Sequence, residues 1–60
     1  MNFYEAFEQM KKGKKVKIKG TENEFFEIRK FAGKDEIVET VSGLPLMISL
    51  QHFEILWEVV

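Results

Sequence analysis

The spacing of apolar residues predicts one helix at the start of the chain. Residues 2–12 (NFYEAFEQMKK) place apolar side chains at helical intervals, at Phe3, Ala6, Phe7 and Met10. Asn2 is typical of a helix N-cap, and Glu5 stands where a capping-box carboxylate reaches back to the cap N–H. Gly13 suits the left-handed residue that ends a helix. We therefore expect a short amphipathic helix over residues 2–12.

From residue 14 the period of the pattern changes from 3.6 to 2, which is typical of strands. Val16 and Ile18 alternate with lysines in residues 14–20 (KKVKIKG), so this strand should have one apolar face. The adjacent residues Phe25 and Phe26 must point to opposite faces of the next strand, so only one of these rings belongs in the core. Turn residues and β-prone residues then predict, in order, a turn at 20–23, a strand at 24–31, a turn at 32–35 and a strand at 36–41.

The last third of the chain is expected to return to the sheet after an interruption. Residues 42–45 (SGLP) break the strand pattern, and Pro45 limits any central strand there. Residues 46–49 (LMIS) are expected to form a brief strand. A single helical turn should follow over residues 49–55, and residues 56–60 (LWEVV) should close the chain as the last strand.

These elements predict a single small domain over residues 1–60. The expected fold class is α+β: an N-terminal helix packed on a small, curled, mainly antiparallel sheet of four to five strands, with a short helical turn before the last strand. A chain this short buries only about 60% of its unfolded surface, so its own core gives marginal stability. The chain has no cysteine and one histidine, so neither a disulfide nor a structural metal site is expected.

Oligomerisation is the remaining common source of stability for so small a domain. Six Phe, one Trp and one Tyr are many aromatic residues for this length, and aromatic residues are enriched at interface cores. We therefore expect a homo-oligomer. No apolar run approaches the ~20 residues that cross a bilayer, and the start of the chain lacks the pattern of a signal peptide, so a soluble, intracellular protein without membrane contact is expected.

A cluster of lysines is the main functional clue. Six of the nine residues 11–19 are lysine, whereas the whole chain carries a net charge of −1 and residues 35–60 contain no Lys or Arg. Such a separation offers anions a localised site. Lys15, Lys17 and Lys19 share one strand face and are candidate phosphate ligands. The alternative is a solvated face whose lysines protect a sheet edge from aggregation.

Other candidate residues give weaker indications. One ring of Phe25 and Phe26 can stack on a base beside the cations, or it can fill the core or a subunit interface. His52 has no Ser, Cys or second base at a catalytic spacing, so we expect a structural or surface residue and no enzyme. No Gly-rich phosphate loop is present. The acidic second half of the chain does not favour a long nucleic acid, which needs a broad basic surface.

Both ends of the chain resemble one family of short phage proteins. The opening NFYEAFEQMKKGKKVKIKG looks like the family's start, a Phe, a Glu-Ala pair, a helix, Gly-Lys-Lys-Val and a basic-Gly pair; the close SLQHFEILWEVV is similar to its final helical turn and Trp-Glu-Val-Val strand. The family includes the Thoeris anti-defence sponges, and related phage proteins counter CBASS defence. The resemblance implies binding of nucleotide immune signals without cleavage, commonly by homotetramers with pockets between subunits.

The matching positions are Gly13-Lys14-Lys15-Val16, Lys19-Gly20, and the segment with Ser49 and Trp57. Family members place Trp and Asn after the basic-Gly pair, where this chain has Thr21 and Glu22. The stacking role is therefore expected to pass to Phe25, Phe26 or Tyr4.

The resulting hypothesis is a phage immune-evasion protein, of anti-Thoeris or anti-CBASS type, in the cytoplasm of the infected bacterial host. It would bind a cyclic nucleotide, either a cyclic dinucleotide or a cyclic ADP-ribose type, with no cofactor and as a homotetramer. The ligand-binding residues would be Lys15, Lys17 and Lys19 at the phosphates, Phe25 or Phe26 against the bases, and Thr21, Ser49 and Gln51 at the base edges. The alternatives are a protein-interaction module that inhibits a host protein and a small nucleic-acid-binding protein.

Overall fold

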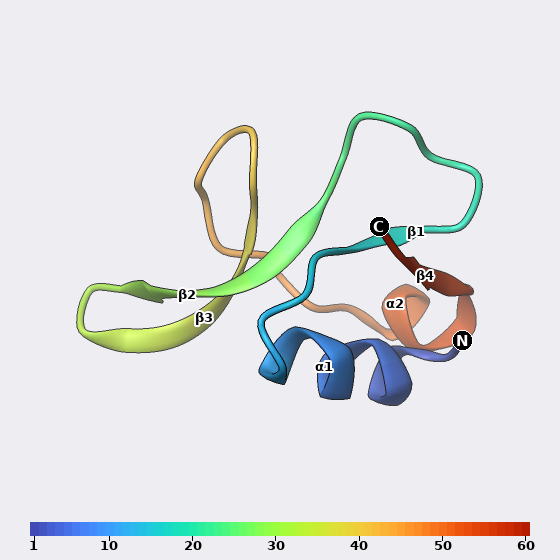
Figure 1. The fold of residues 1–60 in the computed structure, drawn as a ribbon, viewed down its shortest axis with the longest axis horizontal. Helices are drawn as coiled ribbons and strands as arrows, with labels where there is room; N and C mark the ends of the chain where they lie inside the picture. Colours follow the sequence, from blue (N-terminus) through green and yellow to red (C-terminus); the bar gives the residue numbers. More distant parts are fainter.

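The computed structural model describes all 60 residues and has one helix packed against an open antiparallel sheet (Figure 1). This arrangement confirms the predicted α+β fold, including the short helix before the last strand. The elements in chain order are α1 (Phe3–Lys11), β1 (Val16–Ile18), β2 (Phe26–Phe31), β3 (Lys34–Glu39), α2 (Leu50–Glu54) and β4 (Trp57–Val59).

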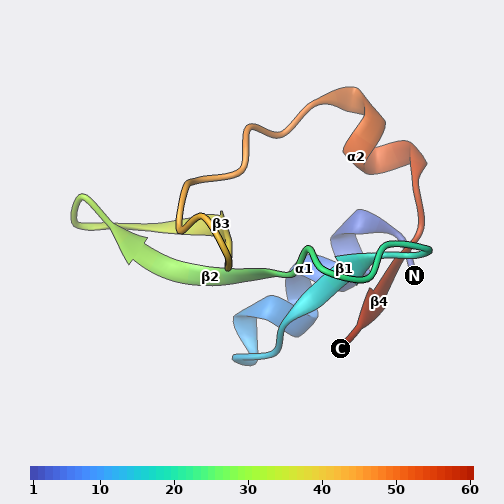
Figure 2. The same cartoon turned by 90° about the horizontal axis from the view of Figure 1, so that it is seen from above.

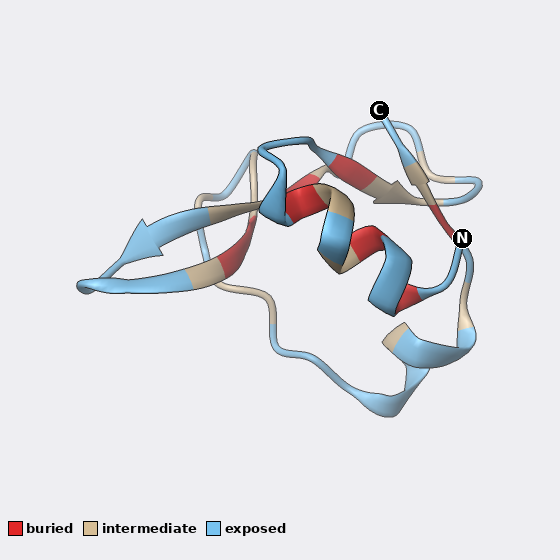
Figure 3. Ribbon diagram, turned by 60° about the horizontal axis from the view of Figure 1, so that its bottom comes forward, coloured by how far each residue is buried: buried red, intermediate tan, exposed pale blue.

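The first helix forms as predicted because its ends are fixed by local contacts. The Asn2 side chain accepts a hydrogen bond from the Glu5 N–H at 2.9 Å, and the Glu5 carboxylate accepts one from the Asn2 N–H at 2.9 Å. Gly13 follows the helix with a φ of 86°, which glycine adopts at little cost. Figure 3 shows the buried positions of α1 on the side that faces the sheet.

The four strands lie in the order β3-β2-β1-β4, and every pair is antiparallel. β2 and β3 form a long hairpin that extends away from α1, whereas β1 and β4 are short and lie against each other and against α1 (Figure 1). β1 is therefore an interior strand. The interpretation of its lysines as protection of a sheet edge was wrong, because sequence alternation assigns faces but not the position of a strand in the sheet.

Both outer edges of the sheet are partly covered by the chain itself. Met1 and Trp57 exchange two backbone hydrogen bonds, of 2.7 and 2.8 Å, along β4. Along β3, the Leu46 N–H donates to the Ile37 carbonyl at 2.7 Å, and the Glu39 N–H donates to the Leu44 carbonyl at 3.0 Å. These contacts leave little unpaired edge for other strands.

The core lies between α1 and one face of the sheet, around Trp57. The Trp57 ring contacts the rings of Phe3 and Phe26 edge-on, with centroids 5.5 Å away in both cases. Its Nε1–H donates to the His52 carbonyl at 3.0 Å, so the buried polar atom has a partner. The buried members of this core are Phe3, Ala6, Met10, Val16, Phe26, Ile37 and Trp57.

The connection between β3 and α2 differs from the prediction. Residues 46–49 do not form a strand, and the only pairing nearby is a single bridge between Val38 and Pro45. Pro45 has no N–H to donate, so it pairs only at the outer edge of the sheet. The chain then leaves the sheet and runs as an open arc to α2 (Figure 2). None of the helices has the length and apolar character that crossing a bilayer requires.

Candidate anion-binding surface

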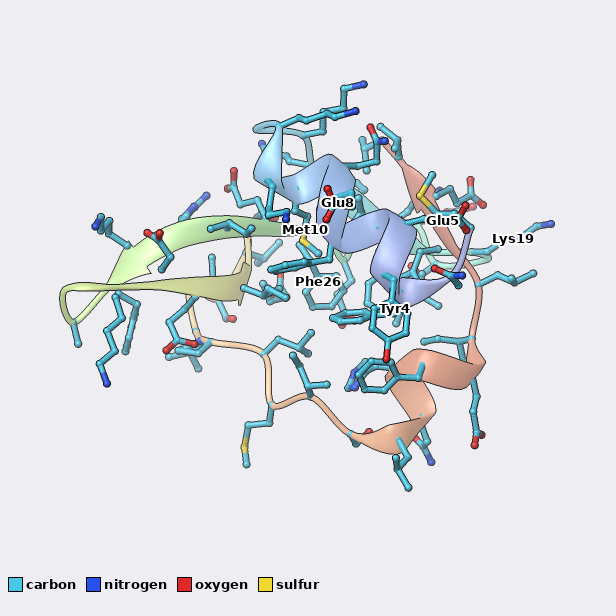
Figure 4. All side chains as sticks on the ribbon, turned by 90° about the horizontal axis from the view of Figure 1, so that it is seen from below. Tyr4, Glu5, Glu8, Met10, Lys19 and Phe26 are labelled. Atoms are coloured by element: carbon cyan, nitrogen blue, oxygen red, sulfur yellow. The ribbon has the colours of Figure 1, made fainter.

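The lysines of β1 lie on the side of the sheet that α1 does not cover. Val16 and Ile18 face the core, so alternation places Lys17 on the opposite side, with Lys15 and Lys19 at the two ends of the strand. We call the surface formed by Lys15, Lys17 and Lys19 the lysine face. Lys15 and Lys19 are exposed, Lys17 is half-buried, and Figure 4 shows Lys19 extending away from the body of the protein.

The backbone of the lysine face is hydrogen-bonded to the last residues of the chain, whereas its lysine side chains form no ion pairs. The Lys15 carbonyl accepts from the Val60 N–H at 3.0 Å, and the Lys19 N–H donates to the Leu56 carbonyl at 2.9 Å. Successive lysine Cα atoms are therefore about 7 Å apart, as in any extended strand. None of these three lysines forms an ion pair, and the chain's ion pairs are Lys11–Glu8, Arg29–Glu27 and Lys30–Asp35. The ammonium groups are thus available to an external anion.

Acidic residues on neighbouring strands limit how positive this surface is. Glu58 lies directly opposite Lys17 on β4, although the two side chains form no ion pair. Glu27 lies on β2 and accepts a hydrogen bond from Arg29 Nε at 2.7 Å, which partly neutralises its charge. The position of Glu58 opposite Lys17 was not predicted, because alternation does not reveal the register between strands. Lys15 and Lys19 are therefore the least compensated cations of the lysine face.

The three candidate stacking residues have different environments, and Tyr4 lies on α1 with its ring beside that of Phe53. Phe26 is buried in the core, with 3% of its surface exposed, and it packs against Trp57. It cannot stack on a ligand without opening the core. Phe25 is half-buried and precedes β2. Since Phe26 pairs with Val16, Phe25 falls on the same side of the sheet as Lys17. Of these rings, Phe25 is the one beside the lysine face.

Of the remaining predicted residues, Thr21 lies close to the lysine face, and Ser49 and Gln51 do not. The Thr21 hydroxyl donates to the Ile18 carbonyl at 2.8 Å and so stabilises the turn after β1. Its oxygen can still accept a hydrogen bond from a ligand. Ser49 and Gln51 are exposed at the start of α2, which packs against α1 and not against β1. The predicted set is therefore divided between two sides of the protomer.

Ser49 is also engaged within its own segment. Its N–H donates to His52 Nδ1 at 2.8 Å, and its hydroxyl lies 3.3 Å from the same nitrogen. These contacts make His52 part of the cap of α2, in line with the structural role expected for it. The protomer has no pocket, and no group of three His, Cys, Asp or Glu side chains lies where it could hold a metal ion.

No family model, curated protein or solved structure matches this chain.

Proposed function

We propose that this protein is a phage immune-evasion protein that binds and sequesters a cyclic nucleotide immune signal without cleaving it. The ligand would be a cyclic dinucleotide or a cyclic ADP-ribose type, bound in the cytoplasm of an infected bacterium. The observation that carries the proposal is the lysine face, in which Lys15, Lys17 and Lys19 have a fixed backbone and no ion-pair partner.

The lysine face and Phe25 suit the two parts of such a ligand. A cyclic dinucleotide carries two phosphate charges, and each exposed ammonium that pairs with one of them adds about 0.2–1 kcal/mol, because water screens the pair. The half-buried ring of Phe25 can stack on a base, which is worth about 1–3 kcal/mol. Both interactions hold a ligand and neither breaks a bond, so the proposed activity is sequestration.

Tight sequestration requires more than one subunit. The protomer has no pocket, so a single lysine face would leave most of the ligand in water. To drain a signal present at nanomolar levels, the dissociation constant must be about nanomolar, or roughly −12 kcal/mol. We therefore propose a homotetramer, in which Thr21 of the same protomer and Ser49 and Gln51 of other subunits reach the base edges. This division between subunits would account for their separation within one protomer.

The proposal is tested by calorimetric titration with cyclic dinucleotides and cyclic ADP-ribose isomers. The double variant Lys17→Glu, Lys19→Glu should weaken binding by at least about 100-fold, since it reverses two charges at the phosphates. The matched control is Lys30→Glu, Lys34→Glu, which makes the same change at the far end of the β2–β3 hairpin (Figure 1). Absence of binding to every compound at micromolar concentration contradicts the proposal, as does equal loss of affinity in the two double variants.

A protein-interaction module is the second candidate function. Twelve large hydrophobic side chains are exposed, and five of them fall within residues 41–50. Exposed apolar surface of this extent marks interaction sites in soluble proteins. This alternative predicts that the purified protein binds no nucleotide and co-purifies with a host protein, whereas the sponge is recovered free of host proteins.

A further inference from the structure

We propose that a second copy of this chain docks on an apolar surface next to α2. This surface consists of Tyr4 on α1, Phe53 and Leu50 on α2, and Met47 and Ile48 before it, and we call it the α2 face. Figure 4 shows Tyr4 pointing toward α2, where its ring lies 5.5 Å from that of Phe53. The exposed fractions are 69% for Tyr4, 89% for Met47, 49% for Ile48, 80% for Leu50 and 39% for Phe53.

The area of the α2 face approaches what a stable dimer needs. A large side chain offers roughly 150–200 Å², so these exposed fractions correspond to about 500–650 Å². A standard interface buries about 800 Å² on each partner. The α2 face can therefore supply most of one partner's half of a dimer interface. It lies at the upper end of the largest apolar patch that a typical monomer leaves in water, about 300–600 Å².

The charge pattern favours a second copy as the partner. Residues 40–53 contain no Lys, Arg, Asp or Glu. In a dimer with two-fold symmetry the same surface meets itself, so any charge near the axis would meet a like charge. Residues 40–53 contribute no such charge. A different partner would be selected by complementary charge at the centre of the surface, and the α2 face has no such charge to offer.

The backbone of the same segment lacks partners within the protomer. The N–H groups of Met47 and Ile48 form no intramolecular hydrogen bond, and the sequence of residues 46–49 is β-prone, which led to the prediction of a strand there. A two-fold axis would place the two copies of this segment side by side and antiparallel, so that each pairs with the other. The missing strand would then form between protomers.

Sedimentation of the purified protein without nucleotide over a concentration series tests this dimer. The wild type should sediment at no less than twice the protomer mass of 7.1 kDa, and at four times this mass if two such dimers form the proposed tetramer. The variant Met47→Glu, Leu50→Glu should weaken the dimer by at least about 100-fold, because two carboxylates per copy enter its centre. Both positions are exposed, so the protomer should stay folded by circular dichroism.

Val41→Glu is the control, since Val41 is 77% exposed but lies in the turn after β3, outside the α2 face. It should dimerise like the wild type. A monomeric wild type at high concentration overturns the proposal, and so does a double variant that dimerises normally. The α2 face contains none of the three lysines, so Lys17→Glu, Lys19→Glu should dimerise like the wild type. Loss of nucleotide binding in that variant with an intact dimer therefore separates failure of the proposed function from failure of the dimer.

Amide hydrogen exchange tests the pairing of the connecting segments. At least one of the Met47 and Ile48 amides should exchange more slowly as the dimer forms. Unprotected exchange of both amides in the dimer overturns the proposed pairing.

Discussion

Glu39 shows how one side chain at the end of β3 shapes the loop that follows it. Its carboxylate accepts hydrogen bonds from the Val41 N–H at 2.6 Å and the Ser42 N–H at 3.1 Å. The bond from Val41, together with those from Ser42, lowers the pKa of Glu39 below its ordinary value of 4.5. The charged form is therefore the one that holds residues 40–43 in place. The sequence did not indicate these hydrogen bonds, because a Glu in an alternating strand is usually a solvated residue.

The lowered pKa gives a prediction for acid. A carboxyl whose pKa is lower in the folded state adds stability above its unfolded pKa, and this stability is lost as the pH falls through the folded pKa. The amides of Val41 and Ser42 should therefore lose protection from hydrogen exchange below about pH 4.5. In Glu39→Gln they should exchange faster than in the wild type at neutral pH, with no further change in this acid range. If protection of the Val41 and Ser42 amides in the wild type does not change with pH, the proposed role of the Glu39 carboxylate is contradicted.

Among the elements, those whose ends are set by neighbouring residues were predicted correctly. The pairing of strands with distant segments was not. α1 was predicted nearly to the residue because Asn2, Glu5 and Gly13 act within one helical turn of its ends. The β2–β3 hairpin was predicted from its turn residues and β-prone residues, although β3 begins and ends two residues earlier than expected, at Lys34 and Glu39 instead of 36 and 41. Residues 46–49 were expected to be a strand because of their β-prone side chains, yet a strand needs a partner, and no partner is visible in one sequence.

The turn of the β2–β3 hairpin offers a stability prediction. Ala32 and Gly33 connect the two strands, and both have positive φ, 52° and 81°. This combination is typical of a type I′ turn, where Asn-Gly is preferred and an alanine at the first position is strained. Ala32→Asn should raise the free energy of unfolding by about 0.5–1 kcal/mol. Ala32→Val should lower it, since a β-branched residue tolerates positive φ worse than alanine. Urea denaturation measures both, and a destabilised Ala32→Asn contradicts the assigned turn.

At the scale of the whole molecule, the two sides of the sheet carry different chemistry. α1, α2 and the core lie on one side, and the lysine face lies on the other. The sequence predicted Lys15, Lys17 and Lys19 on a common face, because alternation alone decides that. It could not predict that Glu58 lies opposite Lys17, or that Ser49 and Gln51 lie away from the lysines, because both depend on how distant segments fold together.

This two-sided arrangement is compatible with an oligomer whose assembly and ligand binding use different surfaces. The apolar α2 face would join protomers, and the lysine face would remain open to an anion. With only eight of 60 residues buried, the protomer has a small core, and association through the α2 face would add to its stability.

The central claim is that the protein holds a cyclic nucleotide and leaves it intact. Its most direct test is to incubate the protein with a cyclic dinucleotide or a cyclic ADP-ribose isomer, remove free ligand, unfold the protein with heat and identify what is released by mass spectrometry. Recovery of the unmodified cyclic nucleotide, in an amount that falls sharply in Lys17→Glu, Lys19→Glu, is the predicted result. Release of a hydrolysed product, or no retained nucleotide from any compound of the panel, would contradict the claim.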